Sequence, residues 1–378
     1  MTKAGIYVHI PFCKFKCIYC DYYSLEKREE EIPKFLEMLI QEIQLTALDY
    51  HEHWMFDTIF FGGGSPSLIE PKWLEKIINS LHQSFDISKV KEITLEANPG
   101  EASRKQLTEF RKLGINRLSI GFQSLQSNLL TFLSRIHSPK DCLTTYNNAR
   151  DADFDNINVD MLYNIPGQSQ QNWQTDLELI IKLAPEHIST YSLTVEQNTP
   201  LHKMILNGQV AVPHKEMDQS MFEFCNKYLT THGYNQYEIT SYSQEGMECY
   251  HNLHNWRLEP YLAFGPSAHR YDGHVREWNL SSLDTYMQKL KQNEKPLSGS
   301  ETLSLTDHIN EAIIYGLRTR EGIQLRKLKS WGTDSEKMKP IITKWENRLI
   351  ITKDFIRLKA DDLMYADKIA SDLILAQS

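Results

Sequence analysis

Three cysteines near the N-terminus are spaced closely enough to serve one metal centre. Cys13, Cys17 and Cys20 follow the pattern C-x3-C-x2-C within eight residues. Thiolates are soft ligands for iron and zinc, and three of them are one short of the four that a [4Fe–4S] cluster takes. The pattern therefore predicts a cluster with one iron left open to a substrate or cofactor.

Two other kinds of site also use closely spaced cysteines. A structural zinc ion takes four ligands, commonly as two C-x2-C pairs, and this sequence has no second pair. A redox dithiol uses two cysteines and would leave the third without a role. The remaining three, Cys142, Cys225 and Cys249, are scattered, and we expect them to behave as small buried hydrophobic residues.

A glycine-rich turn, Gly62–Pro66, directly follows the short apolar segment Thr58–Phe61. Glycines let the backbone approach a ligand closely and present its N–H and C=O groups. Taken alone, such a turn is equally typical of a tight connection between a strand and a helix. Its position at the end of a predicted strand places it on the same rim as the cysteines.

Single polar residues follow several predicted strands or open the helices after them. They are Glu96, Gln123, Arg135 and Asp160. Each one alone is typical of a solvated or capping residue, but their common position at the carboxyl ends of strands favours a shared site. A carboxylate there could bind an ammonium group or ribose hydroxyls, and Arg135 could hold a carboxylate in a bidentate fork.

A third motif, His251-Asn252-Leu253-His254-Asn255-Trp256, lies far downstream in what we expect to be a polar loop. Imidazole is a common axial ligand of haem iron. The aromatic rings of Trp256, Tyr250 and Tyr261 could cover a flat macrocycle. The alternative is a loop whose histidines form local hydrogen bonds.

Strand and helix patterns alternate through the first 200 residues. The expected strands are Gly5–Ile10, Thr58–Phe61, Glu92–Ala97, Arg117–Phe122, Asn156–Leu162 and His187–Leu193. The expected helices are Pro33–Leu48, Lys72–Phe85, Ser103–Leu113, Leu125–Ser134, Pro139–Asp151 and Gln170–Leu183. This alternation predicts parallel strands with crossover helices. A complete eight-unit barrel needs about 250 residues, so we predict an α/β fold with a partial (β/α)6 TIM-like barrel.

The chain is predicted to divide into three parts. Residues 1–200 form the predicted barrel, residues 201–298 complete it and carry the histidine motif, and residues 299–378 form a C-terminal helical, winged-helix-like domain. In the middle part we expect a helix near Lys215–His232, a strand near Asn235–Thr240 and then a loop. In the last part we expect helices Asp307–Gly316, Leu325–Lys329, Glu336–Asn347 and Leu363–Leu375, with a hairpin of Leu349–Thr352 and Phe355–Leu358.

Composition sets the broad class of protein. Of the 378 residues, 41% are hydrophobic and 24% charged, which is typical of a soluble globular protein. The net charge is −8, and no lysine- or arginine-rich run predicts binding to nucleic acid. The sequence has neither a long apolar stretch nor a signal-peptide pattern, so a cytoplasmic location is expected. A reducing compartment also suits an oxygen-sensitive cluster.

Together these motifs resemble the radical S-adenosylmethionine (SAM) superfamily, in the branch of the oxygen-independent coproporphyrinogen III oxidase. The resemblance runs through Tyr7–Cys13, the cysteine triplet, Gly62–Pro66, Glu96–Pro99, Gly121–Ser124, Asp160, Ile165–Gly167 and Gly265–His269, and extends into the C-terminal part. It implies that Cys13, Cys17 and Cys20 hold a [4Fe–4S] cluster. It also implies SAM contacts at Tyr7, Tyr19, Gly63, Gly64, Ser65, Glu96, Gln123, Arg135 and Asp160, with Ser267–His269 as a far wall.

Two subfamilies share this pattern, the oxidases and a group of haem chaperones. The oxidases carry an extra cysteine two positions after the third cluster cysteine, where this chain has Tyr22, and a long extension where it has twelve residues before Cys13. The chaperones carry an H-N-x-x-Y-W motif, which the chain matches from His251 to Trp256 except for Asn255. All three details favour the chaperones, and the resemblance makes His251 a candidate haem ligand.

The resemblance implies a chaperone that binds haem as cargo, together with the cluster and SAM, and delivers it to acceptor proteins of respiration. Membrane-associated acceptors, a reductant such as a flavodoxin or ferredoxin, and a homodimer are compatible with it. The alternatives are decarboxylation of coproporphyrinogen III by radical chemistry, and a redox or iron sensor that uses the cluster structurally. The sequence leaves open whether the chain catalyses any radical reaction.

Overall fold

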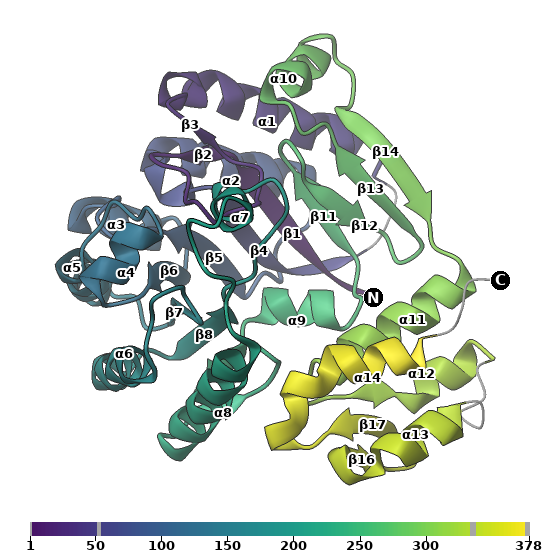
Figure 1. The fold of residues 1–378 in the computed structure, drawn as a ribbon. Helices are drawn as coiled ribbons and strands as arrows, with labels where there is room; N and C mark the ends of the chain where they lie inside the picture. The colour runs from purple at the N-terminus through teal and green to yellow at the C-terminus, as the bar shows by residue number, and fades with distance from the viewer. Residues whose placement is uncertain (1, 51–53, 333–337, 375–378) are drawn as a thin grey trace.

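One large sheet organises most of the chain. The computed structural model describes residues 2–50, 54–332 and 338–374. Within these residues, twelve strands form a single sheet in the order β14-β13-β12-β11-β1-β4-β5-β6-β7-β8-β10-β9 (Figure 1). The sheet does not close on itself, because β14 and β9 stand at its opposite ends.

Six parallel strands form the centre of the sheet. They are β1 (Lys3–Ile10), β4 (Met55–Gly63), β5 (Glu92–Ala97), β6 (Arg117–Gln123), β7 (Ile157–Tyr163) and β8 (His187–Ser192). Each strand pairs in parallel with the next one in this series. The predicted α/β fold with six β/α units is therefore confirmed, since parallel neighbours need crossover connections.

Helices cover one face of these strands. They are α1 (Ile32–Leu48), α2 (Pro71–Ser84), α3 (Arg104–Lys112), α5 (Pro139–Asp151) and α6 (Gln170–Leu183), whereas α4 (Ser127–Phe132) packs through Leu129 in a smaller cluster with Leu162 and Leu193. Ser103, Ser138 and Ser169 begin α3, α5 and α6 through capping boxes, in which side chain and backbone satisfy each other's hydrogen-bonding groups.

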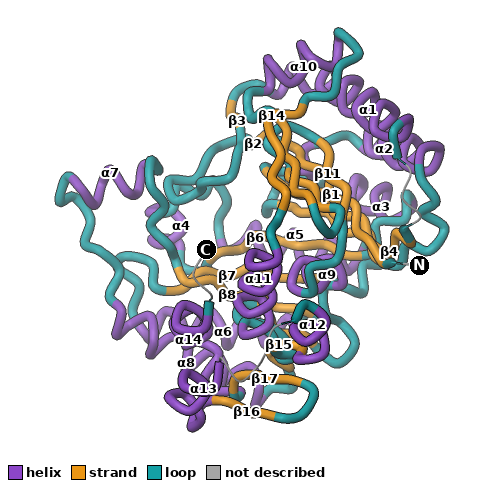
Figure 2. Tube along the Cα trace, turned by 90° about the vertical axis from the view of Figure 1, so that its right-hand side faces the viewer, coloured by secondary structure: helices purple, strands orange, loops and turns teal. Residues whose placement is uncertain are grey.

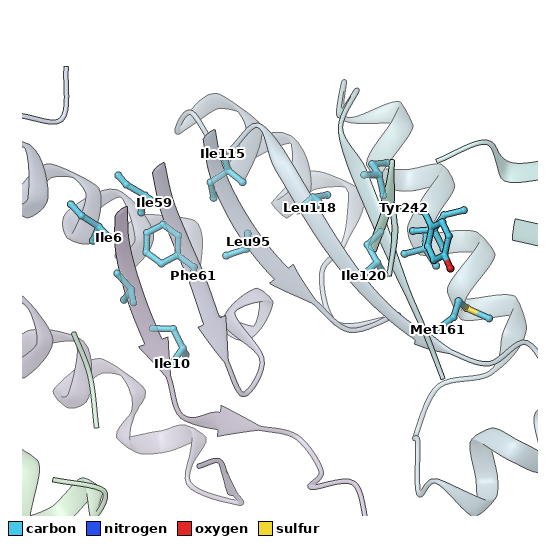
Figure 3. Packing of buried hydrophobic residues seen from close by; sticks show 14 of the residues in the cluster. Ile6, Ile10, Ile59, Phe61, Leu95, Ile115, Leu118, Ile120, Met161 and Tyr242 are labelled. Carbon is cyan, nitrogen blue, oxygen red and sulfur yellow. The ribbon is translucent and has the colours of Figure 1, made fainter. Parts of the chain in front are cut away.

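The main core lies between the sheet and these helices. Strand residues of alternate positions point into it, for example Ile6 beside Ile59 and Phe61 beside Leu95 in the strand register (Figure 3). All four side chains are fully buried. Because strand side chains alternate between faces, the residues between them point to the opposite, inner face.

Residues after 200 extend the sheet at both ends. On the β1 side follow β11 (Tyr261–Phe264), which is parallel to β1, and then the antiparallel strands β12 (His269–Tyr271), β13 (Val275–Asn279) and β14 (Leu297–Thr302). On the β8 side lie β10 (Ser241–Ser243) and β9 (Asn235–Gln236). The helices of this region are α7 (Pro200–Leu206), α8 (Lys215–Thr231) and α10 (Leu283–Lys291). A small two-stranded sheet joins β2 (Phe12–Cys13) to β3 (Leu25–Glu26).

The strand expected over Asn235–Thr240 is wrong beyond Gln236. The chain turns back there, and the Tyr237 N–H donates to the Ser241 carbonyl at 3.2 Å. The carboxylate of Glu238 accepts hydrogen bonds from the N–H and hydroxyl of Thr240, at 3.0 and 2.7 Å. A buried turn therefore separates β9 from β10.

The polar loop expected around His251 is also wrong, because Tyr250–Trp256 forms a helix, α9. The helix contacts β1 and β4, and Figure 1 shows it between the sheet and the C-terminal part of the chain. Its first N–H groups donate to a carboxylate from a distant strand: Tyr250 and His251 each donate to Glu92 at 3.0 Å. A cap from so far along the chain leaves no local signal in the sequence.

The C-terminal elements lie beside α9 (Figure 2), and their buried residues belong to the same core cluster as those of the large sheet. They are α11 (Leu305–Leu317), β15 (Ile323–Gln324), α12 (Leu325–Ser330), α13 (Lys339–Trp345), β16 (Leu349–Ile351), β17 (Phe355–Leu358) and α14 (Ala366–Leu373). The strands among them pair in the order β15-β17-β16: the predicted hairpin is present as β16 and β17, and β15 adds a strand that was not predicted. Of the expected helices, residues 336 and 337 and Leu375 lie outside the described residues.

No helix in the described part of the chain combines the length and the apolar character that crossing a membrane requires.

Candidate functional site

A cavity of about 1080 Å³ lies on the inner face of the sheet and at the carboxyl ends of its parallel strands. Nearly all the residues predicted as site residues line it: Tyr7, Cys13, Cys17, Tyr19, Cys20, Gly63, Gly64, Glu96, Gln123, Arg135, Asp160 and His251. The proposed far wall, Ser267–His269, lines it as well. Ser65 lies behind this surface: it is 1% exposed, and its hydroxyl accepts a hydrogen bond from Asn98 at 2.6 Å.

The cysteine loop leaves β2 and forms one end of the cavity. The Cys20 N–H donates to the Cys17 carbonyl at 3.2 Å, and Cys17 Sγ lies 3.4 Å from an Nη atom of Arg135. All three cysteines are free thiols, and burial raises the pKa of Cys13 to about 11. Such a thiol stays protonated at neutral pH unless a metal displaces the proton.

The three sulfurs are not arranged around a single ion. Among the described residues, no three His, Cys, Asp or Glu side chains converge as one metal ion would require. A [4Fe–4S] cluster binds each thiolate to a different iron and so needs a wider separation of the sulfurs. The all-thiol donor set therefore fits the cluster better than it fits a mononuclear zinc site.

The glycine turn after β4 packs directly against the cysteine loop. The N–H groups of Gly64 and Ser65 donate to the carbonyls of Ile10 and Phe12, both at 2.7 Å. A Cβ on Gly64 would lie 2.5 Å from the Phe12 oxygen and 3.0 Å from Cys13 Sγ. Glycine is required there because any side chain would push the two loops apart.

Two carboxylates line the cavity and interact electrostatically. Glu96 on β5 accepts a hydrogen bond from the Gly63 N–H at 3.1 Å, and Asp160 on β7 accepts from Ser119 at 3.0 Å and Asn158 at 2.8 Å. Burial and the charge of Asp160 raise the pKa of Glu96 to about 8, and burial also raises the pKa of Asp160. This pair can hold a proton or bind a cationic group.

Gln123 and Arg135 shape the adjacent wall. Gln123 has a φ of +67°, and the register of β6 with β7 shifts between Gly121 and Gln123. Positive φ at a residue with a side chain is strained and is found at functional sites. The guanidinium of Arg135 donates to the Gly121 carbonyl at 2.8 Å and to Asn98 Oδ1. Arg135 thus stabilises the chain at the register shift after Gly121 and also contacts Cys17.

His251 lies at the other side of the cavity and is 4% exposed. Its Nδ1 is 2.9 Å from the Thr58 hydroxyl, and no hydrogen bond joins Nε2 to any described residue. The rings of Phe60 and Tyr7 stack near it, with centroids 5.1 and 6.4 Å away. Burial, followed by the nearby charges of His254 and Arg117, lowers the pKa of His251 to about 3. The imidazole is therefore neutral, as a metal ligand must be.

His254, one turn later on α9, has a structural role. Its two ring nitrogens contact the carboxylates of Asp57, at 2.5 Å, and Glu259. Burial lowers the pKa of His254, but these two contacts outweigh burial and raise the pKa to about 9. A charged imidazole between two carboxylates ties α9 to β4.

The motif ends where the barrel meets the C-terminal unit. Trp256 packs edge-on against Tyr315 of α11, with centroids 5.8 Å apart, and Arg318 lies 5.9 Å over the Trp256 ring. All three residues line the cavity, together with Asn255, Tyr261, Tyr271 and Arg276. The region around α9 is therefore rich in aromatic rings with two arginines at their edge.

The polar residues inside the strands were not predicted as site residues. Arg117 and Ser119 on β6, Asn158 on β7, and Ser189 and Tyr191 on β8 line the cavity. The alternation of polar and apolar residues along these strands was the available signal, because alternate residues share one face of a sheet.

Comparison with known proteins shows which family the chain resembles. Residues 7–180 match the family model described as the radical SAM superfamily. The chain is 31% identical to Heme chaperone HemW of Bacillus subtilis over 343 residues, 89% of each protein. It is 32% identical to Heme chaperone HemW of Synechocystis over 92% of this chain and 86% of that protein.

Two further comparisons extend the likeness. The mitochondrial radical S-adenosyl methionine domain-containing protein 1 of Danio rerio is 33% identical over 85% of this chain and 74% of its own length. The solved structure of coproporphyrinogen III oxidase (HemN) from Escherichia coli superimposes with a TM-score of 0.86 at 19% identity, covering 99% of this chain and 90% of that one, which shows a common fold.

The parallel sheet and the three-cysteine loop on its rim define a radical SAM protein, for which a [4Fe–4S] cluster and SAM are the cofactors. The identity over nearly the full length narrows this class further. The chain belongs to the radical SAM family that includes Heme chaperone HemW.

Proposed function

We propose that this chain is a haem chaperone: it binds haem beside a [4Fe–4S] cluster and SAM, and transfers the haem to acceptor proteins. The observation that carries the proposal is His251, a neutral, buried histidine on the same cavity as the three cysteines. Its Nδ1 is engaged by Thr58, while Nε2 has no partner among the described residues. In the tautomer whose Nδ1–H donates to the Thr58 hydroxyl, Nε2 carries the lone pair that can bind iron.

The cluster end of the cavity is assigned to Cys13, Cys17 and Cys20. A bound, reduced cluster supplies an electron. The chain's own contribution is to hold the thiols apart on a loop that the Gly64 turn supports, and to place the Arg135 cation beside Cys17.

SAM is assigned to the wall next to the cluster, formed by Tyr7, Tyr19, Gly63, Gly64, Ser65, Glu96, Gln123, Arg135 and Asp160. The acidic pair of Glu96 and Asp160 suits a ligand with a sulfonium charge and ribose hydroxyls. Burial raises the pKa of both carboxyl groups, and a cation bound beside them would favour their ionised forms. Ser65 supports this wall from behind through Asn98.

Haem is assigned to the part of the cavity that α9 borders. The volume of about 1080 Å³ extends from the cysteine loop to the rings of Trp256, Tyr261 and Tyr315. Flat aromatic rings bury a macrocycle well. Asn255 stands where related chaperones have tyrosine, so the aromatic contacts here come from neighbouring positions instead.

Haem binding is tested on anaerobically reconstituted protein by titration in the Soret region. His251→Ala should lower haem affinity at least tenfold and alter the Soret band, whereas the matched control His232→Ala, on the surface end of α8, should do neither. Unchanged affinity in His251→Ala contradicts the ligand assignment.

The same preparation tests the cofactors and the rival activity. Cys17→Ser should lose the four-iron cluster while Cys142→Ser, a buried cysteine away from the cavity, keeps it. Rapid conversion of coproporphyrinogen III to the vinyl product would contradict the chaperone assignment. Transfer of bound haem to membranes that carry a haem-free respiratory acceptor is the positive test, with flavodoxin or ferredoxin as reductant.

A further inference from the structure

Arg117 is a buried cation without a hydrogen-bonding partner among the residues that the structure describes. It begins β6, is 2% exposed, and lines the large cavity. Its Nε is buried without a hydrogen bond, and no described residue forms a hydrogen bond or ion pair with its guanidinium. Buried arginines are expected to be paired, because the charge otherwise loses its hydration without compensation.

A second unsatisfied polar atom lies next to it. Thr94 on β5 stands opposite Arg117 in the strand register, and its buried hydroxyl also lacks a hydrogen bond. Two unsatisfied groups on paired strands, a cation and a hydroxyl, form the donor side of an anion site. Both donors are of the kind that a carboxylate accepts.

The acidic residues near Arg117 are engaged elsewhere. Glu92 accepts from the N–H groups of Tyr250 and His251, and Asp160 accepts from Ser119 and Asn158. Their negative charges stabilise the Arg117 cation through space, but neither carboxylate accepts a hydrogen bond from its five N–H donors. Those donors therefore remain available to a group that enters from the cavity.

We propose that Arg117 binds a carboxylate of the molecule that occupies the cavity. This assignment rests on the proposed function, under which the carboxylate is a propionate of haem. Arg117 and His251 line the same cavity, and Arg117 is close enough to influence the charge state of that imidazole. Haem carries its iron at the centre and its propionates at one edge. A single macrocycle can therefore present its iron to His251 and a propionate to Arg117.

The test compares haem with haem dimethyl ester, in which both propionates are blocked. The probes are titrated into the reconstituted full chain, into Arg117→Gln, and into the matched control Arg111→Gln on the outer helix α3. The unaltered chain should bind haem at least about tenfold more tightly than the ester, because a charge-assisted bidentate contact is lost. Arg117→Gln should abolish this preference, and Arg111→Gln should retain it.

Each other outcome overturns the assignment in a different way. Equal affinities of the unaltered chain for haem and the ester refute the carboxylate contact but leave haem binding intact, and this comparison needs no variant to fold. Failure of the unaltered chain to bind haem refutes the proposed function as well. A preference that persists in Arg117→Gln, with weakened SAM binding, would assign Arg117 to SAM. If Arg117→Gln keeps the preference for haem over the ester and binds SAM normally, Arg117 contacts only water in the cavity.

Discussion

The carboxylate of Glu92 controls the helix that carries His251. One of its oxygens accepts from the His251 N–H at 3.0 Å and from Cys249 Sγ at 3.6 Å, and the other accepts from the Tyr250 N–H at 3.0 Å. Glu92 is 3% exposed, so water cannot replace these bonds. We predict that Glu92→Gln loosens α9 and weakens haem binding.

The magnitude follows from the acceptors that are lost. Glutamine has one carbonyl oxygen, so the N–H of either Tyr250 or His251 would face an amide NH2 group. Losing a hydrogen bond to a charged group in a buried setting costs about 1.5–3 kcal/mol. If α9 opens locally, amide hydrogen exchange across 250–256 should accelerate about 10- to 150-fold.

Hydrogen–deuterium exchange with mass spectrometry measures this directly. The matched control is Glu42→Gln, another buried carboxylate, which accepts from Gly265, Asn279 and Tyr286. That variant should leave exchange across α9 unchanged. Exchange across 250–256 that is the same in Glu92→Gln as in the unaltered chain would refute the view that this carboxylate holds the helix.

Two further predictions concern the cysteine loop and α9. Gly64→Ala should destabilise the protein by about 1–3 kcal/mol and reduce iron and sulfide per chain after reconstitution, because its Cβ would meet the Phe12 oxygen at 2.5 Å; normal iron content would contradict this. The pKa of His254 is raised from 6.5 to about 9, so its contribution to stability is fully present below pH 6.5 and is lost as the pH rises through about 9. Unfolding free energy, from urea denaturation, should fall by up to about 3 kcal/mol over that range, and His254→Gln should flatten the profile.

The parts of the site that depend on neighbouring residues were predictable from the sequence. The cysteine spacing from Cys13 to Cys20 and the serines that begin α3, α5 and α6 are local features, each confined to a few neighbouring residues. Their spacing therefore carries the information. The six parallel strands were predictable for a similar reason, since each is a short apolar run followed by a helix pattern.

The parts that depend on distant partners were not predictable. Helix α9 has a polar sequence, and its cap comes from Glu92 on another strand. The strands β11 to β14 are short, and β13 has no regular alternation of polar and apolar residues, so only its pairing with the sheet identifies it as a strand. Arg117 lies in a strand whose other residues are mostly apolar, so its place on the cavity appears only when the sheet is assembled.

The pairing of β1 has a consequence for synthesis of the chain. This N-terminal strand pairs with β4 on one side and with β11 on the other, where Gly5 lies beside Tyr261 and Val8 beside Phe264. While a ribosome is still translating the intervening residues, one edge of an apolar strand has no neighbour. Such an edge is prone to aggregation, and domains generally fold as they emerge. One edge of β1 therefore stays unpaired until about 250 further residues have been translated. The nascent chain would be protected from aggregation by a molecular chaperone that binds this N-terminal strand.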